Sequence, residues 1–215
     1  MKILLTGATG FLGHEVLRQA LDDDGIHQVT TLTRRPVGIA HPKLHEALVT
    51  NFLDYSTLDL RDCDACIWSL GVSQLQTTEE QYIRITLDFT MAAARALFAA
   101  NPRARFCFVS GRNADPEEKK SALYARIKGR TERQLEAWGD NVFVFRPAYI
   151  RPTKRSGPRR DLARLFAPIG TVMSMFGKDL SVDCDKLAFC LLDVAKHGAE
   201  RHLLVNSDIR DWKAA

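Results

Sequence analysis

Tyr124 and Lys128 are the residues of this chain best suited to proton chemistry. Residues four apart share one face of a helix, so a helix over this segment would point the phenol and the ammonium into one cleft. A neighbouring ammonium favours the phenolate, which predicts a lowered pKa for Tyr124 and suits the pair to moving a proton at a carbonyl or an alcohol. Because this spacing also arises by chance, the elements around the pair decide its meaning.

A glycine cluster near the N-terminus points to a nucleotide. Gly7, Gly10 and Gly13 lie between the apolar run 3–5 and an amphipathic stretch that begins at Phe11. The spacing is a variant of the dinucleotide fingerprint and predicts a strand, a tight turn and a helix. In that arrangement the glycines allow the turn, the approach of a pyrophosphate and close helix packing, while the helix N-terminus offers N–H groups to the phosphates. A structural turn without a ligand is the alternative.

The end of the second predicted strand, 27–33, bears on the choice of nicotinamide cofactor. NAD sites usually place an acid here to bind the ribose 2′-hydroxyl, whereas NADP sites use arginine to bind the 2′-phosphate. This chain has Arg34 and Arg35 and no acid. Guanidinium groups form charge-assisted pairs with phosphate, so the sequence predicts NADP(H) over NAD(H). A solvated basic turn is the alternative.

Two further segments are expected at the same edge of the sheet. Phe52 follows the third predicted strand, 44–49, and can either pack on an adenine or belong to the core. Ser69, Leu70 and Gly71 end the fourth predicted strand, 65–70, where the glycine lets backbone pass beneath a cofactor or simply ends the strand.

The rest of the chain continues the alternation of strands and helices. The further predicted elements are helices over 78–100, around Tyr124 and over 183–196, and strands over 105–110, 141–145 and 202–205. This rhythm predicts an α/β fold with one doubly wound, mostly parallel Rossmann-type sheet flanked by helices. We expect residues 1–215 to form a single nucleotide-binding domain, in which 150–215 supply the substrate-side lid and the C-terminal elements.

Two stretches within 150–215 have open interpretations. The loop from Arg151 to Arg160 carries five basic residues and is either a solvated loop or a rim facing an anionic substrate, the cofactor phosphate or a partner. The apolar stretch from Leu162 to Phe176 either roofs a pocket or packs into a subunit interface.

Bulk composition excludes several classes of protein. The 215 residues are 46% hydrophobic and 26% charged, as in ordinary globular proteins, and the net charge of +4 is too small to indicate nucleic-acid binding. The chain has no apolar run of about 18 residues and no signal peptide, so we expect a cytoplasmic protein without a membrane span. Five scattered cysteines predict reduced thiols. The Cys63-x-x-Cys66 pair lacks a second pair or a histidine, so no metal site is predicted.

The chain resembles the atypical short-chain dehydrogenases/reductases, and within them the Tat-interacting-protein oxidoreductases. The motifs that carry the resemblance are Thr6-Gly-Ala-Thr-Gly-Phe-Leu-Gly13, Thr33-Arg34-Arg35, Ser69-Leu70-Gly71, Val109-Ser110, Tyr124-x-x-x-Lys128-Gly129, Phe145-Arg-Pro147, Leu180-Ser-Val-Asp183 and Leu203-Leu-Val-Asn206. The resemblance implies a Rossmann-type sheet that holds NADP(H) across its C-terminal edge. It implies Tyr124 as acid/base, Lys128 on the nicotinamide ribose and Pro147 near the nicotinamide. Either Ser110 polarises the substrate carbonyl or the polarising hydroxyl is missing.

The cofactor-binding residues expected on these grounds form a longer set. They are Gly7, Thr9, Gly10, Phe11, Leu12, Arg34, Arg35, Phe52, Ser69, Leu70, Gly71, Lys128, Pro147 and Ile150. Two departures from the resemblance stand out. Gly111 occupies the place of the second serine of a Ser-Ser pair, and Ile85-Thr86 replaces a Val-Asn pair.

Two functions from different classes follow. The first is an NADP(H)-dependent oxidoreductase for an unidentified small carbonyl or alcohol. The second, motivated by Gly111, is a catalytically weak NADP(H)-binding protein with a regulatory or assembly role, for which a homodimer or another protein partner stays open. Nucleic-acid binding through the loop 151–160 has no recognised motif to support it.

Overall fold

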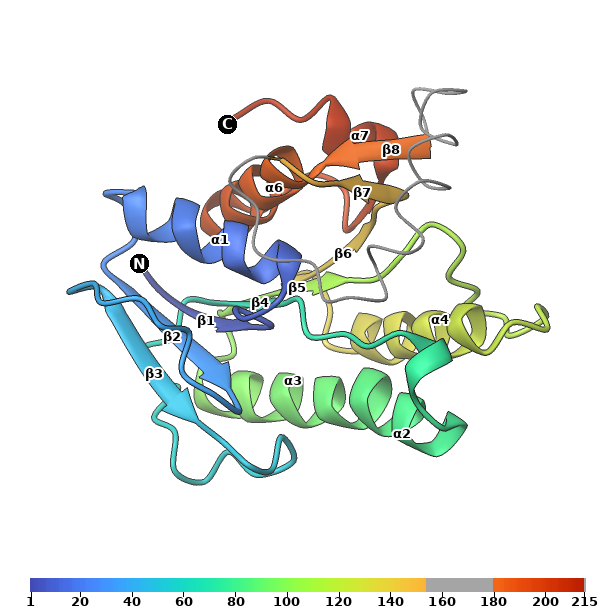
Figure 1. Ribbon diagram of the computed structural model, residues 1–215, viewed down its shortest axis with the longest axis horizontal. Helices are drawn as coiled ribbons and strands as arrows, with labels where there is room; N and C mark the ends of the chain where they lie inside the picture. The colour runs from blue at the N-terminus through green and yellow to red at the C-terminus, as the bar shows by residue number, and fades with distance from the viewer. Residues whose placement is uncertain (154–179, 215) are drawn as a thin grey trace.

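A parallel sheet of seven strands forms the centre of the computed structural model, which describes residues 1–153 and 180–214 (Figure 1). Its strands run in the order β3-β2-β1-β4-β5-β6-β9. Their bounds are β1 (Lys2–Thr6), β2 (Gln28–Thr33), β3 (Leu44–Leu48), β4 (Ala65–Trp68), β5 (Arg105–Val109), β6 (Val142–Arg146) and β9 (Leu203–Val205). The predicted α/β class with a doubly wound parallel sheet is confirmed.

Helices cover both faces of this sheet (Figure 1). On one face lie α1 (Phe11–Asp22) and α6 (Cys184–His197), and on the other α3 (Phe89–Ala100) and α4 (Leu123–Glu136). Each face has its own hydrophobic core, one built with α1 and α6 and one built with α3 and α4. None of the described helices is long and apolar enough to cross a bilayer.

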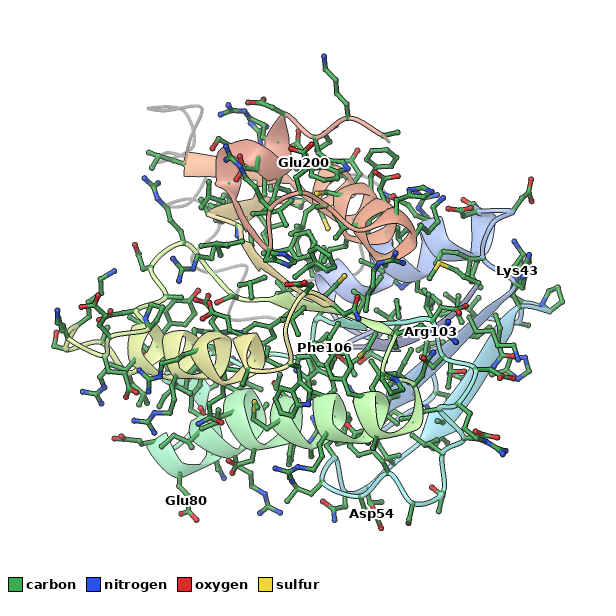
Figure 2. All side chains as sticks on the ribbon, turned by 180° about the vertical axis from the view of Figure 1, so that it is seen from behind. Lys43, Asp54, Glu80, Arg103, Phe106 and Glu200 are labelled. Carbon is green, nitrogen blue, oxygen red and sulfur yellow. The ribbon has the colours of Figure 1, made fainter. Side chains whose placement is uncertain are left out.

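The inner strands are short apolar runs because parallel strands lie under helices on both sides. All four residues of β4 are buried, and so are the three central residues of β5. Phe106 of β5 is fully buried and lies in the interior, whereas Glu80 and Asp54 project at the margin of the molecule (Figure 2).

The strand order reverses between β1 and β4, and this reversal places the site. From β1 the chain moves outward to β2 and β3, then returns to β4 on the other side of β1. In open α/β sheets ligands bind at such a switch point, outside the carboxyl ends of the strands. The glycine turn follows β1, and Ser69-Leu70-Gly71 follows β4, so both expected cofactor segments lie there.

The helix predicted over 78–100 is interrupted, which corrects the prediction of a single regular helix. It begins after Thr78, which closes a capping box with Gln81, and continues as α2 (Glu79–Ile83). A π-helical turn, η2 (Arg84–Asp88), then precedes α3, and the Phe89 N–H donates to the Arg84 carbonyl. Apolar periodicity extends through such a turn, so the sequence pattern does not mark it.

The C-terminal part adds elements that the sequence analysis did not predict. β7 (Tyr149–Arg151) and β8 (Ser181–Asp183) pair as a separate two-stranded sheet, and α7 (Asn206–Arg210) follows β9. Arg151 donates to the Asp183 carboxylate at 2.8 and 3.1 Å, which ties β7 to β8. The predicted strand 65–70 ends at Trp68. The loop beyond Thr153 and the apolar stretch 162–176 lie outside the described residues.

Candidate active site

The turn after β1 has a backbone that needs glycine. Gly7 has a φ of +71°, in the left-handed region, and its carbonyl accepts from the Gly10 N–H at 2.8 Å. A Cβ on Gly13 would lie 2.2 Å from the Gly7 carbonyl oxygen, and a Cβ on Gly7 would lie 2.7 Å from the Ser69 carbonyl oxygen. The turn therefore packs closely against its own helix and against the loop after β4.

Thr6, which the sequence analysis left without a role of its own, fixes that loop. Its hydroxyl accepts from the N–H groups of Ser69 and Leu70 at 3.2 and 3.1 Å, and the Ser69 hydroxyl donates to the Thr6 carbonyl at 2.6 Å. These three bonds join the ends of β1 and β4. The floor of the expected cofactor site is thus held rigidly.

A cleft of about 190 Å³ opens above this floor. Of the expected cofactor residues, Gly7, Thr9, Gly10, Arg34, Arg35, Phe52, Ser69, Leu70 and Gly71 line it. Gly10 is the N-cap of α1 and provides no side-chain cap, which leaves the first N–H groups of the helix for an anion. The missing Cβ atoms, the helix N-terminus and the two arginines in one cleft fit a dinucleotide cofactor.

A neighbouring cavity of about 250 Å³ shares Arg34 and Phe52 with the cleft and adds Arg84 of η2. Phe52 is 4% exposed and stacks on Phe89 at 5.4 Å between ring centroids, so its ring is a core residue at the cavity wall. The Arg84 guanidinium lies 5.9 Å from the Phe89 centroid. Arg84 was missed because the sequence shows only a helix there.

Other expected residues lie away from these two cavities. Leu12 is buried, while Phe11 and Ile150 are partly buried and pack against the core under α1 and α6. The Ser110 hydroxyl is enclosed and has no hydrogen-bond partner among the described residues, although its N–H donates to the Phe145 carbonyl.

Tyr124 lies at the wall of two further cavities, of about 530 and 390 Å³. Pro147 lines the smaller one with it. The Tyr124 phenol packs directly over Gly111, where an added Cβ would fall 1.5 Å from the hydroxyl oxygen. Gly111, the departure from the Ser-Ser pair, thus makes the space that the phenol occupies. Gln74 accepts from the Tyr124 N–H at 2.8 Å and was another residue missed, since 50 positions separate the two.

The electrostatics of Tyr124 reverse the sequence-based expectation. Burial, with smaller contributions from Tyr82 and Glu132, raises the pKa of Tyr124 to about 12. The phenol therefore stays protonated at neutral pH, which is the form of a proton donor.

Lys128 is directed at the protein rather than at the phenol. Its ammonium donates to the Val109 carbonyl at 2.8 Å and lies 4.6 Å from the Phe108 ring centroid. Burial lowers the pKa of Lys128 to about 8, opposed by the Glu132 carboxylate. The Glu132 carboxylate, one turn further along α4, forms an ion pair with Arg146 of β6.

A family model described as the NAD dependent epimerase/dehydratase family matches residues 3–173, which is most of the chain. The chain belongs to this family. The match extends over the glycine turn, the arginine pair and the Tyr124–Lys128 helix together. Within the described residues, no cluster of three His, Cys, Asp or Glu could hold a metal ion.

Relatives of this NAD dependent epimerase/dehydratase family member are distant. The rat protein HTATIP2 is 25% identical over 171 residues, covering 76% of this chain and 69% of its own, in line with the resemblance found from the motifs. The Leucinostatins biosynthesis cluster protein T of Purpureocillium lilacinum is 28% identical over 141 residues. That match covers 63% of this chain and 51% of the fungal protein, so the chain spans about half its length.

A solved structure supports the fold. The Bordetella bronchiseptica enzyme WbmF, crystallised with NAD⁺ and UDP, superposes with a TM-score of 0.73 at 13% identity. The superposition covers 95% of this chain and 71% of WbmF. The shared feature is the Rossmann-like arrangement of strands and helices.

Proposed function

We propose that this protein is an NADPH-dependent reductase of a small carbonyl compound. The observation that carries the proposal is the protonated Tyr124 phenol at the wall of two cavities, at the sheet edge that also bears the glycine cleft. At neutral pH the phenol carries its proton and can donate it to a developing alkoxide, whereas the phenolate needed to withdraw a proton from an alcohol is scarcely populated. Reduction is therefore the favoured direction near neutral pH.

The cofactor assignment follows from the cleft. The glycine turn and the N-terminus of α1 would hold the pyrophosphate, and Arg34 and Arg35 would hold the 2′-phosphate. Neither guanidinium has a carboxylate within 4 Å among the described residues, so both can serve an external anion. When bound, NADPH would supply hydride.

The chain's own residues would supply the rest. Tyr124 donates a proton from its hydroxyl to the carbonyl oxygen of the substrate. Lys128, fixed by the Val109 carbonyl, places a positive charge one helical turn from Tyr124 and compensates the phenolate left behind. Because the Ser110 hydroxyl is enclosed, we assign proton donation to Tyr124 alone. We further propose that residues 1–215 act as one domain, with the C-terminal elements on the substrate side.

Nicotinamide fluorescence tests the proposal in two steps. Titration with NADPH and NADH should show tighter binding of NADPH, because only NADPH carries the phosphate that two arginines can pair with. Tyr124→Phe should then abolish carbonyl reduction while leaving the NADPH affinity almost unchanged, since the phenol lines neither cavity that contains Arg34. Equal turnover by wild type and Tyr124→Phe would refute the mechanism.

A second function is favoured by the region around Gly111. The Tyr124 phenol fills the space of the second serine, and Ser110 is enclosed, so neither serine position offers a polarising hydroxyl to the cavities. A catalytically weak NADP(H)-binding protein would use the same cleft as the proposed reductase but would turn over no substrate. It would bind NADPH, change its affinity for a protein partner on doing so, and oxidise no NADPH with a broad set of carbonyl compounds.

A further inference from the structure

The cavity of about 530 Å³ joins the Tyr124 phenol to a cationic side chain that the sequence analysis did not single out. Three segments line this cavity: the start of α4, the loop before it and the 3₁₀ turn η1 (Gln74–Gln76). They contribute Tyr124 and Ala122, Lys120 and Asn113, and Leu75, respectively. The cavity is separate from the cleft with the glycine turn, because the two share only Val72. A molecule held there reaches the phenol without occupying the cofactor site.

The loop that carries Lys120 is internally fixed. The Asp115 carboxylate accepts from the N–H groups of Lys120 and Glu117 at 2.7 and 3.3 Å, and the Lys120 ammonium donates to the Asn113 carbonyl at 3.2 Å. A Cβ on Gly129 would lie 2.0 Å from the Asp115 carbonyl carbon, so the same loop packs tightly on α4. These contacts fix the position of Lys120 relative to Tyr124.

The Lys120 ammonium has no carboxylate within 4 Å in residues 1–153 and 180–214, although the residue is exposed. Its neighbour Lys119 is 79% exposed and pairs with Glu117, as surface lysines commonly do. The ammonium of Lys120 keeps further donors beyond the one given to Asn113. A cation of this kind at the wall of a cavity suits an anionic group on the molecule bound there.

Leu75 provides an apolar surface on the same cavity. It is 70% exposed, the most exposed of the large hydrophobic residues described, and it stands on a short turn whose Gln74 accepts from the Tyr124 N–H. Covering an exposed leucine with an aliphatic chain removes apolar surface from water and is favourable. The cavity thus offers an apolar contact and a cation to one molecule, next to a proton donor.

We propose that the substrate is a short aliphatic carbonyl compound that carries a carboxylate. Lys120 pairs with the carboxylate, Leu75 covers the chain, and Tyr124 faces the carbonyl group. The assignment of the carbonyl rests on the proposed function, whereas the binding of the carboxylate does not.

A matched pair of aldehydes measures the selectivity. Wild-type protein with NADPH should reduce 6-oxohexanoate with a higher kcat/KM than hexanal, and the preference should weaken with added salt. Lys120→Gln, whose amide can still donate to Asn113, should lower kcat/KM for 6-oxohexanoate about tenfold and leave hexanal unchanged. Lys120→Arg should keep the preference. Lys119→Gln, a neighbouring charge removal outside the cavity, should keep it too.

A binding measurement separates this proposal from the proposed function. By ligand-observed NMR, 6-hydroxyhexanoate should bind the wild-type protein more tightly than hexanol, and Lys120→Gln should remove the difference while Lys119→Gln should not. Lys120-dependent binding without any turnover would refute the reductase and support the carboxylate site. Turnover without a preference for the carboxylate would overturn the carboxylate site. The same conclusion would follow if Arg112→Gln, and not Lys120→Gln, removed the preference, because Arg112 lines the 390 Å³ cavity.

Discussion

Gly111 and Tyr124 act as a matched pair at the level of single residues. The sequence alone indicates only that Gly111 replaces a serine, so that a polarising hydroxyl is lost. In the structure the Tyr124 hydroxyl occupies the position that a Cβ at 111 would take, with 1.5 Å between them. The glycine therefore determines how deeply the phenol enters the site, and with it the burial that raises the pKa of Tyr124 to about 12.

Replacing Gly111 with alanine should expel the Tyr124 side chain from this position. Overpacking of this kind costs about 1–3 kcal/mol, so Gly111→Ala should lower the free energy of unfolding by that amount and reduce turnover. Urea denaturation measures the first effect. In a Tyr124→Phe background the clash with the hydroxyl is absent, so the cost of Gly111→Ala should be smaller, with a coupling of about 1 kcal/mol. Additive costs would show that the two side chains do not compete for one space.

Lys128 makes a second prediction at the residue scale. Its pKa falls to about 8 in the folded protein because the ammonium is buried, whereas the unfolded chain keeps a value near 10.4. Below pH 8 both states are charged and the folded state bears the full cost of burial, on the order of 3 kcal/mol. As pH rises from about 8 to about 10 the folded protein loses this proton first, so the cost disappears.

Lys128→Met should therefore be more stable than wild type at pH 7, by a margin that shrinks toward pH 10. Taking the difference between the two proteins at each pH cancels the titration of every other group. On the proposed mechanism the variant should lose carbonyl reduction, because the positive charge one helical turn from the phenolate is gone. A stability difference that is constant from pH 7 to pH 10 would contradict a buried ammonium at this position.

At the scale of elements, α4 positions Tyr124 and Lys128, and the ion pair between Glu132 and Arg146 attaches this helix to β6. The Arg146 guanidinium donates to both carboxylate oxygens, through Nε at 3.0 and 3.1 Å and through Nη2, and Glu132 is 1% exposed. Removing one partner of a buried pair leaves an uncompensated charge. This attachment keeps Lys128, one turn earlier, next to the Val109 carbonyl.

Arg146→Met should accordingly destabilise the protein by about 3–5 kcal/mol, whereas Arg146→Met with Glu132→Leu should recover most of the loss. Thermal and urea unfolding of the two variants and wild type provide the comparison. The double variant also reveals what the pair does beyond stability: if it orients α4, kcat should fall even where the fold is restored. Full activity in a stable double variant would assign the pair to stability alone.

Sequence patterns predicted the helices and strands better than the turns and loops that connect them. Apolar runs and the glycine turn predicted the seven strands of the central sheet to within two residues, because buried parallel strands and a dinucleotide turn impose strong local patterns. The π turn at Arg84–Asp88 was invisible, since one extra residue per turn barely changes the apolar spacing. Contacts such as Tyr124 with Gly111, or Gln74 with Tyr124, depend on the path of loops after different strands, which no local pattern contains.

The candidate site was predicted in the same uneven way. Many of the expected cofactor residues line one cleft because each follows a strand at one edge of the sheet, as Gly7, Arg34 and Ser69 do. The direction of the Tyr124 pKa was predicted wrongly, because the spacing of Tyr124 and Lys128 says nothing of burial. Lys128 turns instead to the Val109 carbonyl.

At the scale of the whole molecule, the proposed cofactor site bridges two parts of the sheet. The cleft takes residues from the loops after β1 and β2 and from the loop after β4, on both sides of the point where the strand order reverses. A ligand bound there contacts elements that separate on unfolding. Binding should therefore stabilise the fold as a whole, by an amount set by the ligand concentration relative to its dissociation constant.

NADPH at a hundred times its dissociation constant should add about 2.7 kcal/mol, which for a chain of this size raises the Tm by roughly 5–10 °C. NADH at the same concentration should raise it less, because the two arginines then lack a phosphate to pair with. Replacing both Arg34 and Arg35 with glutamine should reduce the NADPH shift to that of NADH. Arg61→Gln removes a charge that is 77% exposed, pairs with Asp59 and lies outside the cleft, so its shift should match wild type. Equal shifts with NADPH and NADH in the wild-type protein would remove the 2′-phosphate from the role of Arg34 and Arg35 while leaving the glycine turn as the dinucleotide site.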